Sequence, residues 1–300
     1  MKSHHLKWQT HNLELGAQTR IMGILNITPD SFSDGGCFFS SETALEHAEQ
    51  MVAAGADIID IGGESSRPFS EPVSTEEECR RVLPVIEKLA ERLNVPISID
   101  TTKAEVARQA MLAGASIIND ISALRIDPRI GDIAAQNDAL LILMHMKGMP
   151  ANMQLAPAYE DLLGEIFAFL EQAVDRAVAS GIDRNKLIID PGIGFGKTVD
   201  HNLCIINQLP KFHQLGLPIL MGTSRKAFIR KILDTQGAAA ALPPSSPVFE
   251  TGTQASIAAA TINGAHIVRV HNVANTVATV KIADSIRNAC SSEASPAVNH

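Results

Sequence analysis

Several short apolar runs in this chain end on carboxylate or amide side chains, which are groups that bind polar ligands and metal ions. Asp100, Asp120 and Asp190 each close such a run, Asn119 stands beside Asp120, and Asn26 closes the first run, so these acceptors are expected to converge. Their oxygens can accept hydrogen bonds from a planar, guanidine-like pair of N–H groups, as a pterin, a guanine or an arginine offers, or they can bind a divalent metal ion. The residue types alone leave both possibilities open. Asp120 could equally cap the backbone that follows it.

The segment around Asp190, IIDPGIGFGKT, is the most specific of these. Pro191 favours extended backbone at Asp190 and the glycines tighten the loop, so we expect the carboxylate to be aimed at a ligand. The segment is not a phosphate loop, because Pro191 stands where GxxxxGK[ST] requires glycine. Its glycines, at 192, 194 and 196, also fail the dinucleotide pattern GxGxxG.

The last apolar run, IVRVH, carries two basic side chains. Arg269 and His271 alternate with Val270, so both are expected on the same side of a strand. The next segment predicts a helix whose N-terminus faces them, which is a favourable setting for a phosphate. We therefore expect acidic groups on one flank of the site and cationic groups on the other.

Eight apolar runs must position these residues, and they alternate with helical patterns. Such alternation predicts buried parallel strands joined by helices. Eight units in about 250 residues predict an α/β fold, a single (β/α)8 TIM barrel with its active site at the C-terminal ends of the strands. With the polar clusters that follow them, the runs extend to Asn26, Arg67, Asp100, Asp120, His145, Asp190, Lys226 and His271.

The sequence predicts one catalytic domain over residues 20–288, and the remaining segments are expected to have structural roles. Residues 1–19 predict a hairpin-like extension that plugs the barrel bottom, and 289–300 a flexible tail. The small-residue, proline-rich segment 236–252 predicts a long surface loop. Thr102 and Glu105 predict a capping box. An apolar stripe predicts a helix over Leu163, Ile166, Phe167, Leu170, Val174 and Ala177.

Composition excludes several classes of protein. The net charge is −8 and the chain has no run of Lys or Arg, so nucleic acid is not an expected partner. No apolar stretch is long enough to span a bilayer, and the N-terminus lacks the apolar region of an export signal. The cysteines, at 37, 79, 204 and 290, are far apart and form no CxxC, which indicates a reducing, cytoplasmic location.

Taken together, the motifs identify a family. The segments MGILNITPDSFSDGG, DIGGESSRP, SIDTTKAEVA, INDIS, LMHMKGMPANMQ, DPGIGFGKT, GTSRKAFI and RVHNV resemble, in order, those of the dihydropteroate synthases of folate biosynthesis. These are transferases that join 6-hydroxymethyl-7,8-dihydropterin diphosphate to p-aminobenzoate and release pyrophosphate. The resemblance implies an Mg²⁺-assisted dissociative substitution, inhibition by sulfonamides, and a homodimer that packs through its outer helices.

The resemblance also implies roles for single residues. The pterin would be bound by Asp100, Asn119, Asp190 and Lys226. The diphosphate would be held by Asn26, Arg269 and His271, with Asn26 also a ligand of Mg²⁺. The p-aminobenzoate pocket would be formed by Ser66, Arg67, Pro68, Phe195 and Lys226. The groups acting in the chemical step would be Asp34, Ser66, Arg67 and Lys226.

The chain departs from the family pattern at a few positions. Ser66 stands where the family usually has Thr, and Phe69 where it commonly has Gly. Lys147 stands where Gln is common, Ala227 where Ser is common, and Asn272 where Asp is common. Phe69 and Ala227 flank the expected aminobenzoate pocket, so they bear on sulfonamide binding. Two other functions use a similar pterin site: methyl transfer from methyltetrahydrofolate to a corrinoid protein, and pterin binding without turnover. The expected diphosphate clamp, Arg269 with His271, favours the synthase over both.

Overall fold

The computed structural model describes residues 2–28, 39–65, 72–148, 153, 157–234, 243 and 246–289. Eight parallel strands lie in the order β8-β7-β6-β5-β4-β3-β10-β9, and a parallel bridge between Ile189 and Ile219 joins the two end strands. The sheet therefore closes, which confirms the expected (β/α)8 barrel. Its strands are β3 (Arg20–Asn26), β4 (Ile58–Gly62), β5 (Ile97–Asp100), β6 (Ile117–Asp120), β7 (Leu140–Met144), β8 (Leu187–Asp190), β9 (Leu220–Met221) and β10 (Ile267–Val270).

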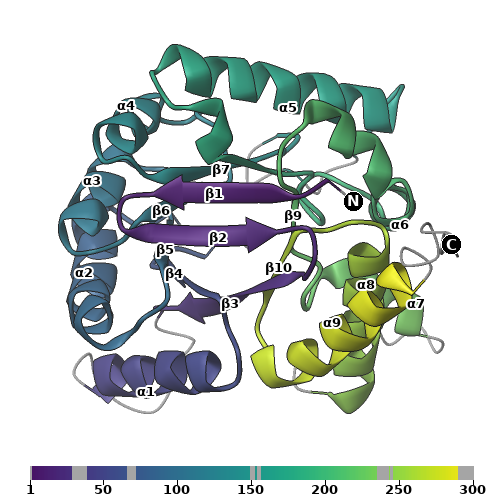
Figure 1. Cartoon of the computed structure of the whole chain (residues 1–300), viewed down its shortest axis with the longest axis horizontal. Coiled ribbons are helices and arrows are strands. Elements are labelled where there is room, and N and C mark those ends of the chain that lie inside the picture. The colour runs from purple at the N-terminus through teal and green to yellow at the C-terminus, as the bar shows by residue number, and fades with distance from the viewer. Residues whose placement is uncertain are drawn as a thin grey trace, which may run out of the picture.

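Helices surround the barrel (Figure 1). They are α1 (Phe39–Ala53), α2 (Thr75–Arg92), α3 (Ala104–Leu112), α4 (Arg129–Gln136), α5 (Leu162–Ala179), α6 (Val199–Asn207), α7 (Ala227–Leu233), α8 (Pro247–Ile262) and α9 (Val273–Asn288), with the 3-10 turns η2 (Arg184–Lys186) and η3 (Leu209–Leu215). The stripe predicted for α5 is confirmed, since Ile166, Leu170 and Val174 are buried.

Two local predictions were wrong. The expected capping box does not form, because α3 begins at Ala104 and its N-cap, Lys103, makes no capping side-chain bond. Instead, Asp127 Oδ2 accepts a hydrogen bond from the Ala104 amide at 3.0 Å, a contact between distant segments that replaces a local cap. The expected loop over 236–252 is also too long, since α8 begins at Pro247, where proline suits the first helical position.

The two-residue period of the strands decides which side chains enter the barrel. Ile58 packs in the cluster inside the barrel, whereas its neighbour Ile59 packs in the cluster between the barrel and its helices. The same alternation holds in the other strands. It turns the last inward positions of six strands toward the mouth, namely Asn26, Gly62, Asp100, Asn119, Asp190 and Arg269.

The opposite end of the barrel is closed by an antiparallel hairpin, β1 (His4–Trp8) and β2 (His11–Leu15). Figure 1 shows it lying across the barrel. Leu6 and Trp8 are each only 2% exposed and join the cluster of inward barrel side chains that includes Ile58. The plug predicted from the sequence is therefore confirmed, and ligands can reach the interior polar groups only from the other end.

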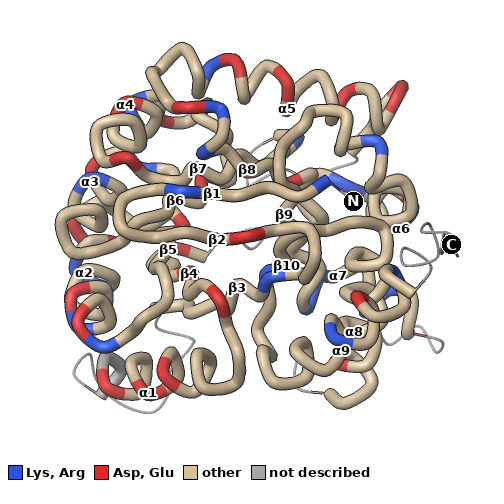
Figure 2. Tube along the Cα trace, viewed as in Figure 1, with Lys and Arg blue, Asp and Glu red and all other residues tan. Residues whose placement is uncertain are grey.

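Charged residues of both signs are interleaved on the outer helices, for example on α2, α4 and α5 (Figure 2). Along the described part of the chain this arrangement differs from the continuous basic stripe that binds a nucleic-acid backbone. Across the same residues, every helix is too short or too polar to cross a lipid bilayer.

Candidate active site

An ion-pair network occupies the floor of the barrel mouth. Arg269 reaches across from β10 and donates from Nε to Asp60 Oδ2 at 2.5 Å and from Nη2 to Asp100 Oδ2 at 2.6 Å. Asn119 Nδ2 donates to the same Asp60 oxygen at 3.1 Å. Four strands thus contribute to one network, as expected if their C-terminal ends converge.

Asp60 is a site residue that sequence reasoning missed. It is fully buried, and no donor among the described residues reaches its second oxygen, Oδ1. A buried carboxylate oxygen without a partner is costly and therefore marks a place for a donor from a ligand or a water molecule. A signal was present: Asp60 interrupts the apolar run IIDIG at an inward position, two residues after Ile58.

Burial and the ion pairs shift the pKa values of the residues in this network. Burial raises the pKa of Asp100 to about 7, although Arg269 opposes this shift. Burial alone would lower the pKa of Arg269, but Asp60 and Asp100 raise it overall, so the guanidinium stays charged. The prediction that the two signs lie on separate flanks was wrong: the cation lies between the acids, because unpaired charges of one sign could not be buried together.

Asp190 lies at the end of β8, and its Oδ1 accepts a hydrogen bond from the Gly192 amide at 2.7 Å. Gly192 has a φ of 73°, which glycine adopts readily, and a Cβ there would collide with the His145 carbonyl oxygen at 1.9 Å. Burial raises the pKa of Asp190 to about 6, against the opposing charges of Lys226, Lys197 and Arg269. The Gly192 amide therefore fixes the position of Asp190 Oδ1.

Lys226 and Phe195 meet at the same mouth, as expected from their assignment to one pocket. The Lys226 ammonium lies 4.1 Å from the centre of the Phe195 ring, and its stem passes over Gly194, where a Cβ would lie 3.0 Å from Lys226 Cδ. Burial and the charge of Arg269 lower the pKa of Lys226 to about 8, while Asp190 and Asp100 resist this shift. The site thus joins an aromatic wall to a cation.

Beneath Phe195 lies a buried pair that the sequence did not predict. Lys197 is 3% exposed; its Nζ contacts His145 Nδ1 at 2.9 Å and donates to the Phe195 carbonyl oxygen at 3.0 Å. Burial lowers the pKa of Lys197 to about 7 and that of His145 to about 2, so His145 is neutral and accepts from the lysine. Because Lys197 donates to the Phe195 carbonyl oxygen, this pair fixes the position of the loop that follows β8.

Asp120 does not belong to the mouth. It points outward from β6, where its Oδ1 accepts from the Ser122 amide at 2.8 Å and its Oδ2 from the Leu124 amide at 2.6 Å. Its role is to cap the following turn, the alternative that the sequence left open.

His271 follows β10, and its Nδ1 lies 3.0 Å from Ser224 Oγ, which also accepts from the His271 amide at 3.2 Å. The predicted helix α9 begins directly after it. Asn272, one of the departures from the family pattern, is the N-cap of α9 and accepts from the Asn275 amide at 3.1 Å. Asparagine caps helices as well as aspartate does, so this departure preserves the geometry.

Oxygen ligands for a hard cation lie beside Gly62. A Cβ at Gly62 would lie 3.7 Å from Asn26 Oδ1 and 3.8 Å from Asp100 Oδ2, so the glycine keeps open a space between an amide and a carboxylate. Within the described ranges no three His, Cys, Asp or Glu side chains form a ready-made metal site. The residues fit Mg²⁺, which takes one or two protein oxygens and completes its shell with water and substrate phosphates.

Part of the predicted site lies outside the described residues, namely Asp34, Ser66, Arg67, Pro68 and Phe69. Two further departures from the family pattern are placed. Lys147 pairs with Glu165 at 2.7 Å, at the start of α5. Ala227 is the first residue of α7, next to Lys226.

The chain is similar to several known proteins. Residues 22–271 match the family described as pterin binding enzyme. The dihydropteroate synthase of Synechocystis sp. is 49% identical over 271 residues, which cover 90% of this chain and 91% of the relative. The structure is similar to that of Yersinia pestis dihydropteroate synthase in a sulfonamide complex, with a TM-score of 0.86, 44% identity, and coverage of 95% and 99%. It is equally similar to the Xanthomonas albilineans enzyme with 4-aminobenzoic acid, with a TM-score of 0.86, 40% identity, and coverage of 98% and 100%.

Proposed function

The chain belongs to the dihydropteroate synthases within the pterin-binding enzyme family, and from this premise we propose how its mouth residues divide the reaction. The reaction is that of folate biosynthesis, which joins 6-hydroxymethyl-7,8-dihydropterin diphosphate to p-aminobenzoate and releases pyrophosphate. The observation that carries the proposal is the convergence of three inward acids, an amide and Arg269 in one mouth.

The pterin ring is bound by Asp190, Asn119 and Asp100. The second oxygen of Asp190, together with Oδ1, faces a pair of N–H groups on the ring, and the charged carboxylate makes these hydrogen bonds strong. Lys226 donates to ring oxygen or nitrogen atoms, and its contact with Phe195 keeps it over the ring. The orphaned Oδ1 of Asp60 accepts a further hydrogen bond, directly or through water.

The diphosphate is held by Asn26, Arg269 and His271. Arg269 is paired with Asp60 and Asp100. Its side chain is 19% exposed, so it can turn part of its five-donor guanidinium toward phosphate oxygens. Asn26 and the substrate phosphates would hold Mg²⁺, with Asp100 beside them; the ion, when bound, would neutralise charge on the departing diphosphate.

The substitution is dissociative. Arg269 and His271 stabilise the pyrophosphate as the C–O bond breaks, and the carboxylates of Asp100 and Asp190 stabilise the cationic pterin methylene that remains. The neutral aryl amine then attacks the methylene to form the C–N bond, and the proton that its nitrogen loses passes to the departing pyrophosphate or to water, so no strong base is needed. Its pocket is formed by Phe195 and Lys226 with Ser66, Arg67 and Pro68, and sulfonamides would compete for it. Asp34, Ser66, Arg67 and Lys226 complete the catalytic set.

An assay of pyrophosphate release tests this function. The purified protein should release pyrophosphate and form dihydropteroate in equal amounts, and only when both the pterin diphosphate and p-aminobenzoate are present. Binding of the pterin without release would instead indicate a non-catalytic paralogue. Methyl transfer from methyltetrahydrofolate to a corrinoid protein would indicate the methyltransferase and overturn the proposal.

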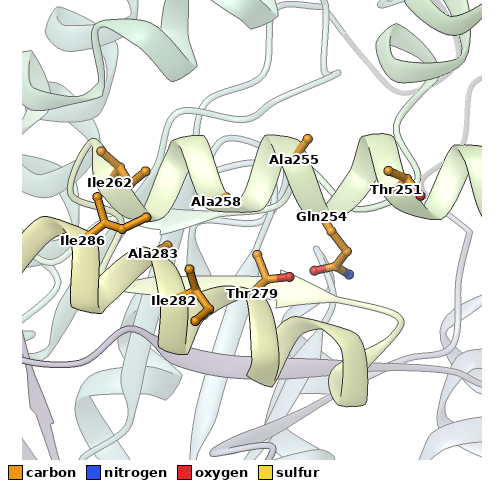
Figure 3. Close-up of a pocket in the computed structure, with 9 residues that line it drawn as sticks. All are labelled: Thr251, Gln254, Ala255, Ala258, Ile262, Thr279, Ile282, Ala283 and Ile286. Atoms are coloured by element: carbon orange, nitrogen blue, oxygen red, sulfur yellow. The ribbon is translucent and has the colours of Figure 1, made fainter.

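We also propose a homodimer formed through α8 and α9. The two helices border an apolar groove of about 340 Å³ (Figure 3). Three isoleucines at one end of it are unusually exposed: Ile262 is 42%, Ile282 65% and Ile286 59% exposed. Small residues of α8 that line the groove, Ala255 and Ala258, would let a second copy approach closely.

Light scattering with size exclusion tests the dimer. Ile282→Glu should convert the protein to a monomer, because the charge would be buried in the interface. Leu112→Glu is the matched control, since Leu112 is 70% exposed on the distant helix α3. A monomeric parent protein, or a dimer that survives Ile282→Glu, would contradict this interface.

We further place the protein in the cytoplasm. The two described cysteines, Cys79 and Cys204, are free thiols. Thiols that form no disulfide suit a reducing compartment, which supports this placement.

A further inference from the structure

A second, smaller cavity lies beside the diphosphate clamp, between α1, the turn after β9 and the start of α9. This rim pocket has a volume of about 250 Å³, and three basic side chains line it: His47, Arg225 and His271. None of the described residues that line it is acidic. The nearby Glu49 of α1 is instead engaged by Arg92 at 3.2 Å. The Arg225 guanidinium and the two imidazoles offer N–H donors and at least one positive charge in a chain of net charge −8, which favours an anionic ligand.

The backbone of α9 adds donors to the rim pocket. Val273 and Ala274, the first two residues of this 16-residue helix, line the cavity. Their amides have no acceptor within the described part of the chain, whereas the next two amides bond to Asn272. The free N–H groups and the helix dipole favour an anion at this end.

Arg225 is held in an unfavourable backbone conformation at the edge of this cavity. Its φ is 57°, in the left-handed region that a long side chain rarely adopts, and its amide donates to Thr253 Oγ1 at 3.4 Å. Strain of this kind is retained where it places a functional group. Burial lowers the pKa of His47, and the nearby charge of Arg225 lowers it further, which shows that the two basic groups are close.

We propose that the rim pocket is a second anion site, which receives pyrophosphate as it leaves the diphosphate clamp. His271 belongs to both sites, so the anion can move outward without passing through a region that lacks donors. The cavity is large enough for a diphosphate, and its guanidinium, imidazole and backbone N–H groups can donate to the oxygens of such an anion. This inference rests on the proposed function, because it takes Arg269 and His271 as the clamp.

Product inhibition by inorganic pyrophosphate tests the rim pocket. The variants are His47→Gln and Arg225→Asn; asparagine tolerates the left-handed backbone, so the second variant removes the charge without adding strain. Lys88→Gln is the matched control, because it removes one positive charge from the exposed face of α2. Melting temperatures verify that all variants are folded.

We expect the inhibition constant for pyrophosphate to rise at least fivefold in each rim variant and to stay unchanged in the control. The KM for the pterin diphosphate should change less than twofold. An unchanged inhibition constant would overturn the proposal. So would a parallel rise of both constants, because it would assign His47 and Arg225 to the clamp itself. Both constants are measured after the release assay has shown turnover in the parent enzyme, so a failure of the proposed function appears in that assay and a failure of the rim pocket appears in the variants.

Discussion

Replacing Asp190 with asparagine separates pterin recognition from folding. The asparagine side chain would retain an oxygen for the Gly192 amide, now 2.7 Å from Asp190 Oδ1, so the loop should keep its shape. It would replace the other oxygen with an N–H donor that faces the donors of the pterin. Losing one hydrogen bond to a charged group costs about 1.5–3 kcal/mol, and the opposed donors bring the sum to about 3 kcal/mol. This corresponds to a loss of roughly 150-fold in kcat/KM.

The assay is steady-state release of pyrophosphate at saturating p-aminobenzoate, with Asp120→Asn as the matched control. Asp120 is also a buried aspartate at a strand end, but both its oxygens accept from backbone amides of the following turn. Its variant should lose about 1–3 kcal/mol of unfolding free energy in urea while keeping its kcat/KM. The reasoning fails if Asp190→Asn stays within threefold of the parent kcat/KM, or if both variants lose activity equally.

Further outcomes are expected. The kcat/KM should fall as pH drops through 7 to 6, because Asp100 and Asp190, with pKa values of about 7 and 6, gain protons and stop accepting; a flat acid profile would contradict this. It should also fall above about pH 8 as Lys226 loses its proton, and Lys226→Arg should remove that limb; a limb that persists would exclude Lys226. Trp8→Ala should lower the unfolding free energy in urea by about 3–5 kcal/mol, because Trp8 is buried. It should leave the KM for the pterin diphosphate unchanged, because the plug lies at the end of the barrel opposite the mouth. A chelator should abolish turnover and added Mg²⁺ should restore it; full activity in the chelator would remove the metal from the mechanism.

The barrel could be predicted from the sequence because its strands are buried on both sides. Each strand must then be a short apolar run, and eight such runs alternating with helical patterns leave few other folds. The same signal located the ends of the strands, and thus Asn26, Asp100 and Asp190. It failed locally where distant segments decide the outcome, as at Ala104, whose amide is capped by Asp127 and not by Thr102.

Counting residues in steps of two would have improved the prediction of the site. In β6, Ile117 and Asn119 point inward, so Asp120 must point outward and cannot reach the mouth. In β4, Ile58 points inward, so Asp60 does too.

Other features could not be read from the sequence at all. The contact of Lys197 with His145 joins residues 52 positions apart, and the bond of Arg269 to Asp60 spans 209. No periodicity encodes such pairs, because they depend on how the strands are arranged around the closed barrel.

The central claim is that one mouth binds the pterin ring through its acids and the diphosphate through Arg269. Calorimetric titration of 6-hydroxymethyl-7,8-dihydropterin diphosphate and of the same pterin without its diphosphate tests it directly, in the parent protein, in Asp190→Asn and in Arg269→Gln. Asp190→Asn should weaken both ligands by a similar factor, whereas Arg269→Gln should weaken only the diphosphate form, by at least tenfold. Equal weakening of both ligands by Arg269→Gln, or no effect of Asp190→Asn on the pterin alone, would contradict this division of the site.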